Sequence, residues 1–145
     1  MDYTSLVGTT GRREFVVERS HTTNCFGPQD DPPLQSAAAD AGPEESVRVF
    51  GTPALLAWVE FTGRRSLRGL LPEGMGCAGE YASVSHRLAV PEGVSLVAET
   101  EVVAVEGSRL SLEGGVTREA DGDTVGTVET DFRVVDRDAF RERVA

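Results

Sequence analysis

Lysine is absent from this sequence of 145 residues, and all 14 of its basic residues are arginines. Aspartate and glutamate together number 24, which gives a formal net charge of −10 at pH 7. A chain of this charge repels the phosphate backbone, so binding to nucleic acid is not expected. No apolar run approaches the roughly 18 residues of a membrane span, so no membrane partner is expected either. These absences favour an acidic globular protein.

Cysteine and histidine are also scarce. The two cysteines, Cys25 and Cys77, are too few for a disulfide framework, and neither belongs to a CxxC pair. With only two histidines, a structural zinc site is not expected, and the sequence predicts no metal or redox cofactor. The first eight residues lack the basic and apolar regions of a signal peptide, so we expect a cytoplasmic protein.

The length predicts a single domain over residues 1–145. Residues 12–19 have the composition of a first strand. Residues 27–47 are rich in proline, alanine and acidic residues and contain no aromatic residue, which predicts a flexible loop. Such a loop is either a solvated connection or a flap over a site, and the sequence leaves both open.

One helix stands out after this loop. Thr52 is a good N-cap and Pro53 suits the first helical position, so the helix should begin there and run to about Arg68. Arg64 and its basic neighbours near the helix end complement the helix dipole, and they are also candidates for binding ligand phosphates.

The hydrophobic period then changes to two, which indicates strands. Expected strands cover residues 81–88, 94–106, 110–112 and 128–134, with turns at 91–93, 106–109 and 121–123. A short helix is expected at 137–144. One long apolar helix against antiparallel strands predicts an α+β fold of the hotdog type, with a curved sheet wrapped around the helix.

Three residues carry the chemical hypothesis. Glu60 is the one carboxylate in the apolar run 53–62, about two helical turns after Thr52. His86 falls on the apolar face of a strand. A hydroxyl, a carboxylate and an imidazole among apolar neighbours are typical of acid–base or nucleophilic chemistry at an acyl group. Each also has a structural interpretation: Thr52 as a helix cap, His86 as a hydrogen-bonded core residue, and Glu60 as part of a buried polar cluster.

These residues lie in a pattern that resembles the hotdog acyl-CoA thioesterases, and most of all the fluoroacetyl-CoA thioesterase family. The matching segments are Val49-Phe-Gly-Thr-Pro-Ala-Leu-Leu-Ala-Trp-Val-Glu60, Leu71-Pro-Glu-Gly74, Gly79, Val84-Ser-His86, Pro91-Glu-Gly93, Val125-Gly126 and Phe140. The resemblance covers about residues 48–140.

The resemblance implies a catalytic group in which Thr52 orients Glu60, Glu60 attacks the thioester carbonyl or activates water, and His86 is the acid–base partner. It also implies that the backbone N–H near Gly79 holds the thioester oxygen. The remaining candidates for substrate binding are Phe50, Phe132, Arg64 and Arg87. The expected substrate is an acyl-CoA with a small or medium acyl group, and the expected assembly is a homodimer, or a tetramer, with each site shared between subunits.

The sequence departs from the family in its aromatic-free loop, in Pro53 after Thr52, and in Phe132 at a position where the family has arginine. Arg133 is one residue away and should face the other side of the sheet. The main alternative function is a non-catalytic hotdog protein that binds an acyl thioester or another apolar ligand. A hotdog enoyl-CoA hydratase and a structural dimer with a vestigial site are further alternatives.

Overall fold

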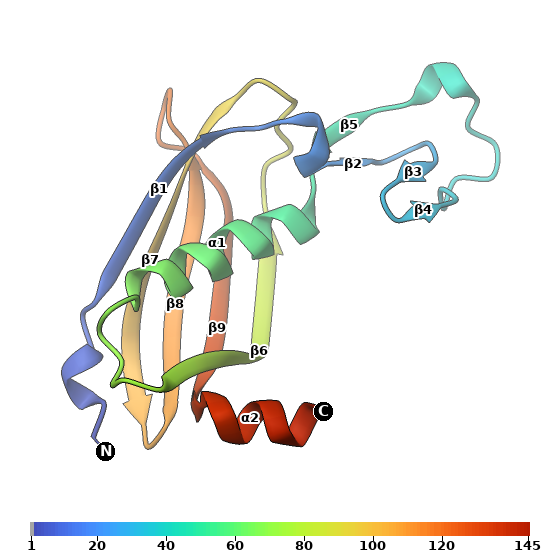
Figure 1. The fold of residues 1–145 in the computed structure, drawn as a ribbon. Helices are drawn as coiled ribbons and strands as arrows, with labels where there is room; N and C mark the ends of the chain where they lie inside the picture. The colour runs from blue at the N-terminus through green and yellow to red at the C-terminus, as the bar shows by residue number, and fades with distance from the viewer. Residues whose placement is uncertain (1) are drawn as a thin grey trace.

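A helix of 15 residues crosses one face of a five-stranded antiparallel sheet in the computed structural model, which describes residues 2–145 (Figure 1). The sheet contains β1 (Thr10–Val16), β6 (Met75–His86), β7 (Ser95–Glu106), β8 (Arg109–Arg118) and β9 (Thr124–Asp136), in the spatial order β1-β7-β8-β9-β6. The helices are α1 (Thr52–Ser66) and α2 (Arg137–Val144). The shorter elements are η1 (Thr4–Leu6), η2 (Arg19–His21), β2 (Thr22–Asn24), β3 (Gln29–Asp30), β4 (Pro33–Leu34), η3 (Pro43–Glu45) and β5 (Arg48–Phe50).

The start of α1 differs from the expectation in one detail. Gly51 is the N-cap, and Thr52 is already the first helical residue, with no side-chain bond to the helix backbone. The predicted capping role of Thr52 is therefore wrong, and its hydroxyl is free for another partner. Pro53 stands in the first turn, where its missing N–H costs nothing.

Glycines allow α1 to pack closely on the sheet. A Cβ atom at Gly126 would lie 2.4 Å from a methyl of Leu55, and one at Gly114 would lie 2.7 Å from Val59. Leu55 has no exposed surface and Val59 is 2% exposed. Burying each of these side chains contributes about 1.5–3 kcal/mol to folding. The small residues of β8 and β9 thus fix the position of α1, and with it the positions of Thr52 and Glu60.

Strand β6 is one edge of the sheet, and it bends. Its pairing with β9 shifts register between Gly79 and Tyr81, which leaves Glu80 as the extra residue of a bulge. A bulge of this kind bends the strand, and Figure 1 shows β6 turning sharply on its way to His86. The bend places the first half of β6 across the end of α1 and the second half alongside the start of α1.

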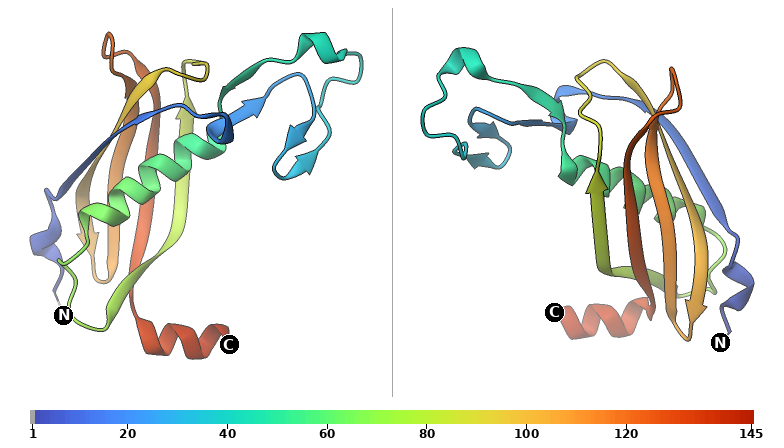
Figure 2. Two further views of the ribbon diagram at one scale, coloured as in Figure 1. Left: turned by 45° about the horizontal axis from the view of Figure 1, so that its top comes forward. Right: turned by 180° about the vertical axis from the view of Figure 1, so that it is seen from behind.

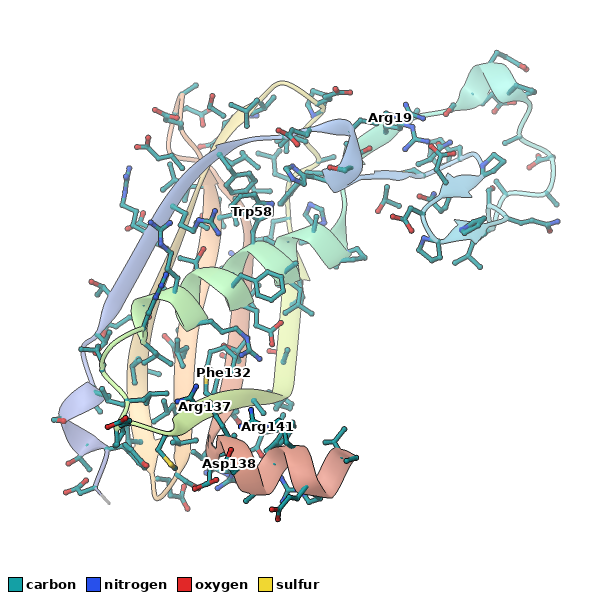
Figure 3. All side chains as sticks on the ribbon, in the orientation of Figure 1. Arg19, Trp58, Phe132, Arg137, Asp138 and Arg141 are labelled. Carbon is teal, nitrogen blue, oxygen red and sulfur yellow. The ribbon has the colours of Figure 1, made fainter. Side chains whose placement is uncertain are left out.

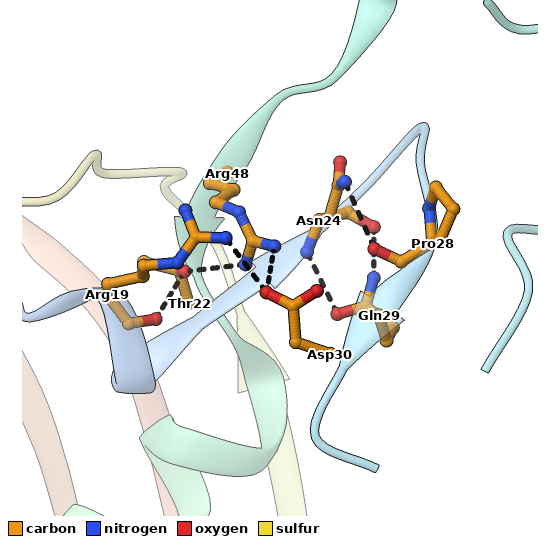
Figure 4. Close-up of polar contacts among 7 residues, drawn as sticks. All are labelled: Arg19, Thr22, Asn24, Pro28, Gln29, Asp30 and Arg48. Carbon is orange, nitrogen blue, oxygen red and sulfur yellow. Dashed lines mark hydrogen bonds and ion pairs between the residues drawn. The ribbon is translucent and has the colours of Figure 1, made fainter. Parts of the chain in front are cut away.

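Residues 22–50 form an arm that extends away from the sheet in each view (Figures 1 and 2). Strands β2 and β5 pair at its base. Further out, the carboxylate of Asp30 accepts hydrogen bonds from Arg19 and Arg48, each at 2.8 Å (Figure 4). The stretch 27–47, expected as a loop, contains only the short elements β3, β4 and η3. Its flexibility remains a prediction.

The structure confirms the hotdog arrangement, a long helix held by an antiparallel sheet, and the closing helix at residues 137–144. The first strand begins and ends earlier than expected, at Thr10–Val16 instead of 12–19. Arg133 does face away from Phe132, and it pairs with Glu80 at 2.8 Å. Within residues 2–145, neither helix has the length and apolar composition to cross a membrane.

Candidate active site

The hydroxyl of Thr52 and the imidazole of His86 form a hydrogen-bonded pair. Thr52 Oγ1 lies 2.9 Å from His86 Nδ1, and the other ring nitrogen, Nε2, lies 3.2 Å from the carbonyl oxygen of Leu88. A carbonyl can only accept, so Nε2 carries a proton. In the neutral ring Nδ1 is then unprotonated, and it accepts the hydrogen bond that Thr52 donates. His86 is thus oriented as a base toward the Thr52 hydroxyl.

This pair faces a pocket. Thr52 is exposed and His86 is half-buried, and both line a pocket of about 500 Å³ together with Val49, Pro53 and Leu88. The walls are mostly apolar, and Cys25 and Arg87 stand at the same pocket. A small apolar pocket beside a polarised hydroxyl suits a short acyl chain.

Glu60 lies against Gly79 on β6. A Cβ atom at Gly79 would be only 2.6 Å from Glu60 Oε1, so the carboxylate occupies space that a glycine alone provides. Glu60 is half-buried, and its carboxylate makes no hydrogen bond or ion pair with any of residues 2–145. A half-buried carboxylate without a partner is costly unless a ligand, water or another chain satisfies it.

Cys77 and Arg64 adjoin this carboxylate. Arg64 Nη1 donates to the backbone oxygen of Cys77 at 2.9 Å, and its guanidinium carbon lies 5.2 Å from the ring centre of Phe132. Burial raises the pKa of the Cys77 thiol; the positive charge of Arg64 opposes this shift, and the negative charge of Glu60 adds to it. The thiol therefore stays protonated at neutral pH and is a poor nucleophile.

The chain does not bring its three candidate catalytic residues together. Thr52 and Glu60 are eight residues apart on one helix, and a rise of 1.5 Å per residue separates them by about 12 Å. Within one chain Thr52 bonds to His86 and not to Glu60, so the orienting role of Thr52 toward Glu60 stays a prediction. Thr52–His86 stands at the beginning of α1, and Glu60–Gly79 stands near its middle.

Two aromatic candidates for substrate binding are core residues. Phe50 and Phe132 have no exposed surface. Phe50 packs edge-on to His86, with ring centres 6.4 Å apart, and this contact helps to hold the imidazole in place. Phe132 lies between α1 and the sheet. Its ring is also close to the position that a Cβ atom would take at Gly79. Phe50 lies in the wall of the 500 Å³ pocket, whereas Phe132 does not line it, and the roles of both in substrate binding stay predictions.

The sequence did not reveal two further features of the site. The carbonyl of Leu88, which fixes the His86 tautomer, is a backbone group with no side-chain signal. Phe61 on α1 is 53% exposed, and Tyr81 on the edge strand β6 is 57% exposed. The available sequence signal for Phe61 was its place on the same face of α1 as Arg65, one turn later. Arg65 is exposed, so an apolar residue on this face points outward.

A larger pocket of about 620 Å³ lies elsewhere, across β1, β7, β8 and β9. Its lining includes the carboxylates Glu99, Glu101 and Glu113 and contains no histidine or cysteine. Thr100 faces α1, so the alternating pattern of the strand turns Glu99 and Glu101 to the outer face of the sheet. This pocket lacks a base paired with a hydroxyl, and it is not the candidate site.

Comparison with known proteins defines the class. A family model described as fluoroacetyl-CoA-specific thioesterase matches residues 34–138. The solved structure of the fluoroacetyl-CoA thioesterase FlK is 26% identical, with a TM-score of 0.75, over 95% of this chain and 93% of that chain. A hot-dog-like protein from Thermanaerovibrio acidaminovorans is 24% identical, with a TM-score of 0.79, over 99% and 95% of the two chains. No curated protein sequence matches the chain.

Fold and site therefore define a hotdog-fold thioester hydrolase. The family model covers most of the chain, and the protein belongs to the fluoroacetyl-CoA-specific thioesterase family. The structure from Thermanaerovibrio, at its lower identity, bears on the fold alone.

Proposed function

We propose that this protein hydrolyses the thioester of an acyl-CoA with a small or medium acyl group, using Glu60, Thr52 and His86. The observation that carries the proposal is the polarised Thr52–His86 pair beside an apolar pocket. The unpartnered carboxylate of Glu60 against Gly79 supports it. Solved structures of FlK mutants contain fluoroacetate with CoA, or acetyl-CoA, which supports an acyl-CoA as substrate here.

The chemistry needs a base or nucleophile, a donor to the developing oxyanion and little more, because a thiolate leaves readily. In the proposed reaction, the Glu60 carboxylate takes a proton from water as the water oxygen bonds to the thioester carbon. Direct attack by Glu60, followed by hydrolysis of the resulting anhydride, is the second route. In both, a backbone N–H near Gly79 donates to the oxyanion. The C–S bond then breaks. In the first route the thiolate takes the proton that Glu60 removed from water, passed on through the Thr52–His86 pair, and Glu60 is again a carboxylate. In the second route the water that hydrolyses the anhydride supplies this proton. Neither route requires a metal or a redox cofactor.

A homodimer completes the proposed site. Strand β6 is a free edge of the sheet, and an unpaired edge can accept another strand. Tyr81 on this strand and Phe61 on α1 are large and exposed. Antiparallel pairing of β6 with a second copy would place the two α1 helices side by side in opposite directions. Glu60 of the partner subunit could then reach the Thr52–His86 pair, which Glu60 of the same chain cannot reach.

The test is release of free thiol from a panel of short, branched, aromatic and long acyl-CoAs, at low and molar salt. Wild type and Glu60→Ala are compared, and Glu92→Ala, an exposed acid in the turn after β6, is the matched control. Release that depends on Glu60 and prefers short chains is expected. Equal release by wild type and Glu60→Ala would contradict the proposal.

The alternative is a binding protein that holds an acyl thioester without cleaving it. The packing of the His86 ring against Phe50 favours a structural role for the imidazole. A binder would raise its melting temperature with acyl-CoA and release no thiol. The thiol assay and a thermal shift on the same samples therefore separate the two functions.

A further inference from the structure

The arginines of this chain divide into two groups. Half of the 14 arginines have a carboxylate within 4 Å, namely Arg12, Arg19, Arg48, Arg109, Arg118, Arg133 and Arg141. Of those with no such partner among residues 2–145, four line one pocket of about 560 Å³, namely Arg64, Arg65, Arg68 and Arg137. We call this site the four-arginine pocket.

Three elements form the four-arginine pocket. Arg64 and Arg65 come from the last turn of α1, and Arg68 comes from the turn that follows. Arg137 comes from the start of α2 and is labelled in Figure 3. Arg65, Arg68 and Arg137 are exposed, while the Nε of Arg64 is buried without an acceptor.

One carboxylate, Glu73, is among the residues that line this pocket, and it makes no ion pair within residues 2–145. The pocket therefore has a local excess of positive charge, whereas the chain as a whole has a net charge of −10. Four guanidinium groups that gather without counter-ions repel one another. Such an arrangement is favourable when a multiply charged anion binds among them, and the planar fork of arginine matches phosphate oxygens.

The four-arginine pocket adjoins the proposed catalytic carboxylate. Arg64 lies one helical turn after Glu60, and Cys77, whose backbone oxygen binds Arg64, is two residues before Gly79 on β6. A ligand could thus place phosphates among the arginines and extend along the contact of α1 with β6 to Glu60.

We propose that the four-arginine pocket binds the phosphate groups of coenzyme A, which makes the free coenzyme the acyl carrier of this enzyme. This inference rests on the proposed function. An acyl carrier protein would need an extended surface of free cations to dock on. Here four of the seven arginines that have no carboxylate within 4 Å among residues 2–145 share one pocket, and Arg13 stacks on Trp58. Arg87 and Arg143 are isolated exposed arginines outside the pocket.

Direct binding tests the pocket without relying on catalysis. Coenzyme A is titrated into the protein by calorimetry, with pantetheine as the phosphate-free probe and inorganic phosphate as the simple anion. The triple variant Arg65→Gln, Arg68→Gln, Arg137→Gln should raise the Kd for coenzyme A at least about tenfold, because charge-assisted hydrogen bonds are lost. Arg143→Gln is the matched control for an exposed charge, and it should leave this Kd unchanged.

Kinetics give the second readout. The triple variant should raise KM for acyl-CoA and leave kcat unchanged, and it should hydrolyse the N-acetylcysteamine thioester, which lacks phosphates, as wild type does. Raised salt should weaken acyl-CoA binding in wild type and have less effect in the variant.

Any of three results would overturn the inference. Coenzyme A could bind equally to wild type and triple variant, or inorganic phosphate could bind as tightly as coenzyme A. The third is that an acyl carrier protein thioester is hydrolysed faster than the acyl-CoA, at a rate that the triple variant does not change. Arginine-dependent binding of coenzyme A without thiol release would uphold the pocket and contradict the proposed function.

Discussion

Thr52 Oγ1 lies 2.9 Å from His86 Nδ1, so the first residue of α1 and the last residue of β6 form one hydroxyl–imidazole pair. The Leu88 carbonyl fixes the tautomer in which the imidazole accepts from the hydroxyl. Glu60 stands about two turns from this pair, on the same helix. The proposed mechanism therefore depends on two half-sites and on a second copy that joins them.

Removal of the Thr52 hydroxyl tests the first half-site. Thr52→Val keeps the shape and should lower turnover at least about tenfold, while Thr52→Ser should keep most activity, as expected for a group that acts through its hydroxyl. Because Thr52 is exposed and does not cap α1, Thr52→Val should change the free energy of unfolding by less than about 0.5 kcal/mol. Turnover comes from thiol release and stability from urea titration. Wild-type turnover in Thr52→Val would remove this residue from the mechanism.

A methyl group at Gly79 tests the second half-site. Gly79→Ala would place its Cβ 2.6 Å from Glu60 Oε1, so the carboxylate must move, and kcat should fall at least about tenfold. Gly76→Ala on the same strand is the control, since its Cβ meets only the flexible Arg137 side chain at 3.4 Å or more. The prediction fails if the two variants have the same kcat at saturating substrate.

The packing of α1 predicts a stability effect. Gly126→Ala would push a Cβ to 2.4 Å from Leu55 and 2.8 Å from the Ser85 carbonyl oxygen. Overpacking at such a site should lower the free energy of unfolding by about 1–3 kcal/mol. Urea denaturation of this variant beside Gly76→Ala measures the difference. Equal stabilities would show that α1 does not depend on glycine at this position.

The thiol of Cys77 should lose its proton at a higher pH than an ordinary thiol does. Its pKa is raised by burial, so alkylation by iodoacetamide should reach half its maximal rate at a higher pH than a small-molecule thiol in the same buffers. Cys25→Ser removes the exposed thiol and isolates Cys77 for this measurement. In the variant Arg64→Gln the rise should be larger, because Arg64 opposes it. A Cys77 profile at or below that of the free thiol would contradict the environment described.

The fold was accessible from the sequence because its signals are local. The change of period from α1 to the strands, the turns at 106–109 and 121–123, and the closing helix at 137–144 all depend on neighbours in the chain. The prediction that Thr52 is the N-cap was wrong because Gly51 takes that position. Which of two neighbouring residues caps a helix depends on the backbone conformation, which the sequence does not give. The burial of Phe50 and Phe132 depends on how closely α1 packs against the glycines of the sheet, which is a tertiary property.

The site was only partly accessible. Glu60 and His86 are marked by polar chemistry in apolar surroundings, so their candidacy follows from the sequence. Their mutual distance does not, because eight residues along a helix mean about 12 Å and a second chain is needed to close that gap. The four-arginine pocket joins Arg137 to residues more than 60 positions earlier, and no local pattern announces such a contact.

Complementation between subunits tests the central claim most directly. Chains with Thr52→Val and chains with Glu60→Gln, each expected to be strongly impaired as a homodimer, are coexpressed with different tags and purified as heterodimers. If each site combines Thr52–His86 of one chain with Glu60 of the other, the heterodimer has one intact site of two and should recover about half of the wild-type thiol release. A heterodimer as inactive as its parents would contradict the account.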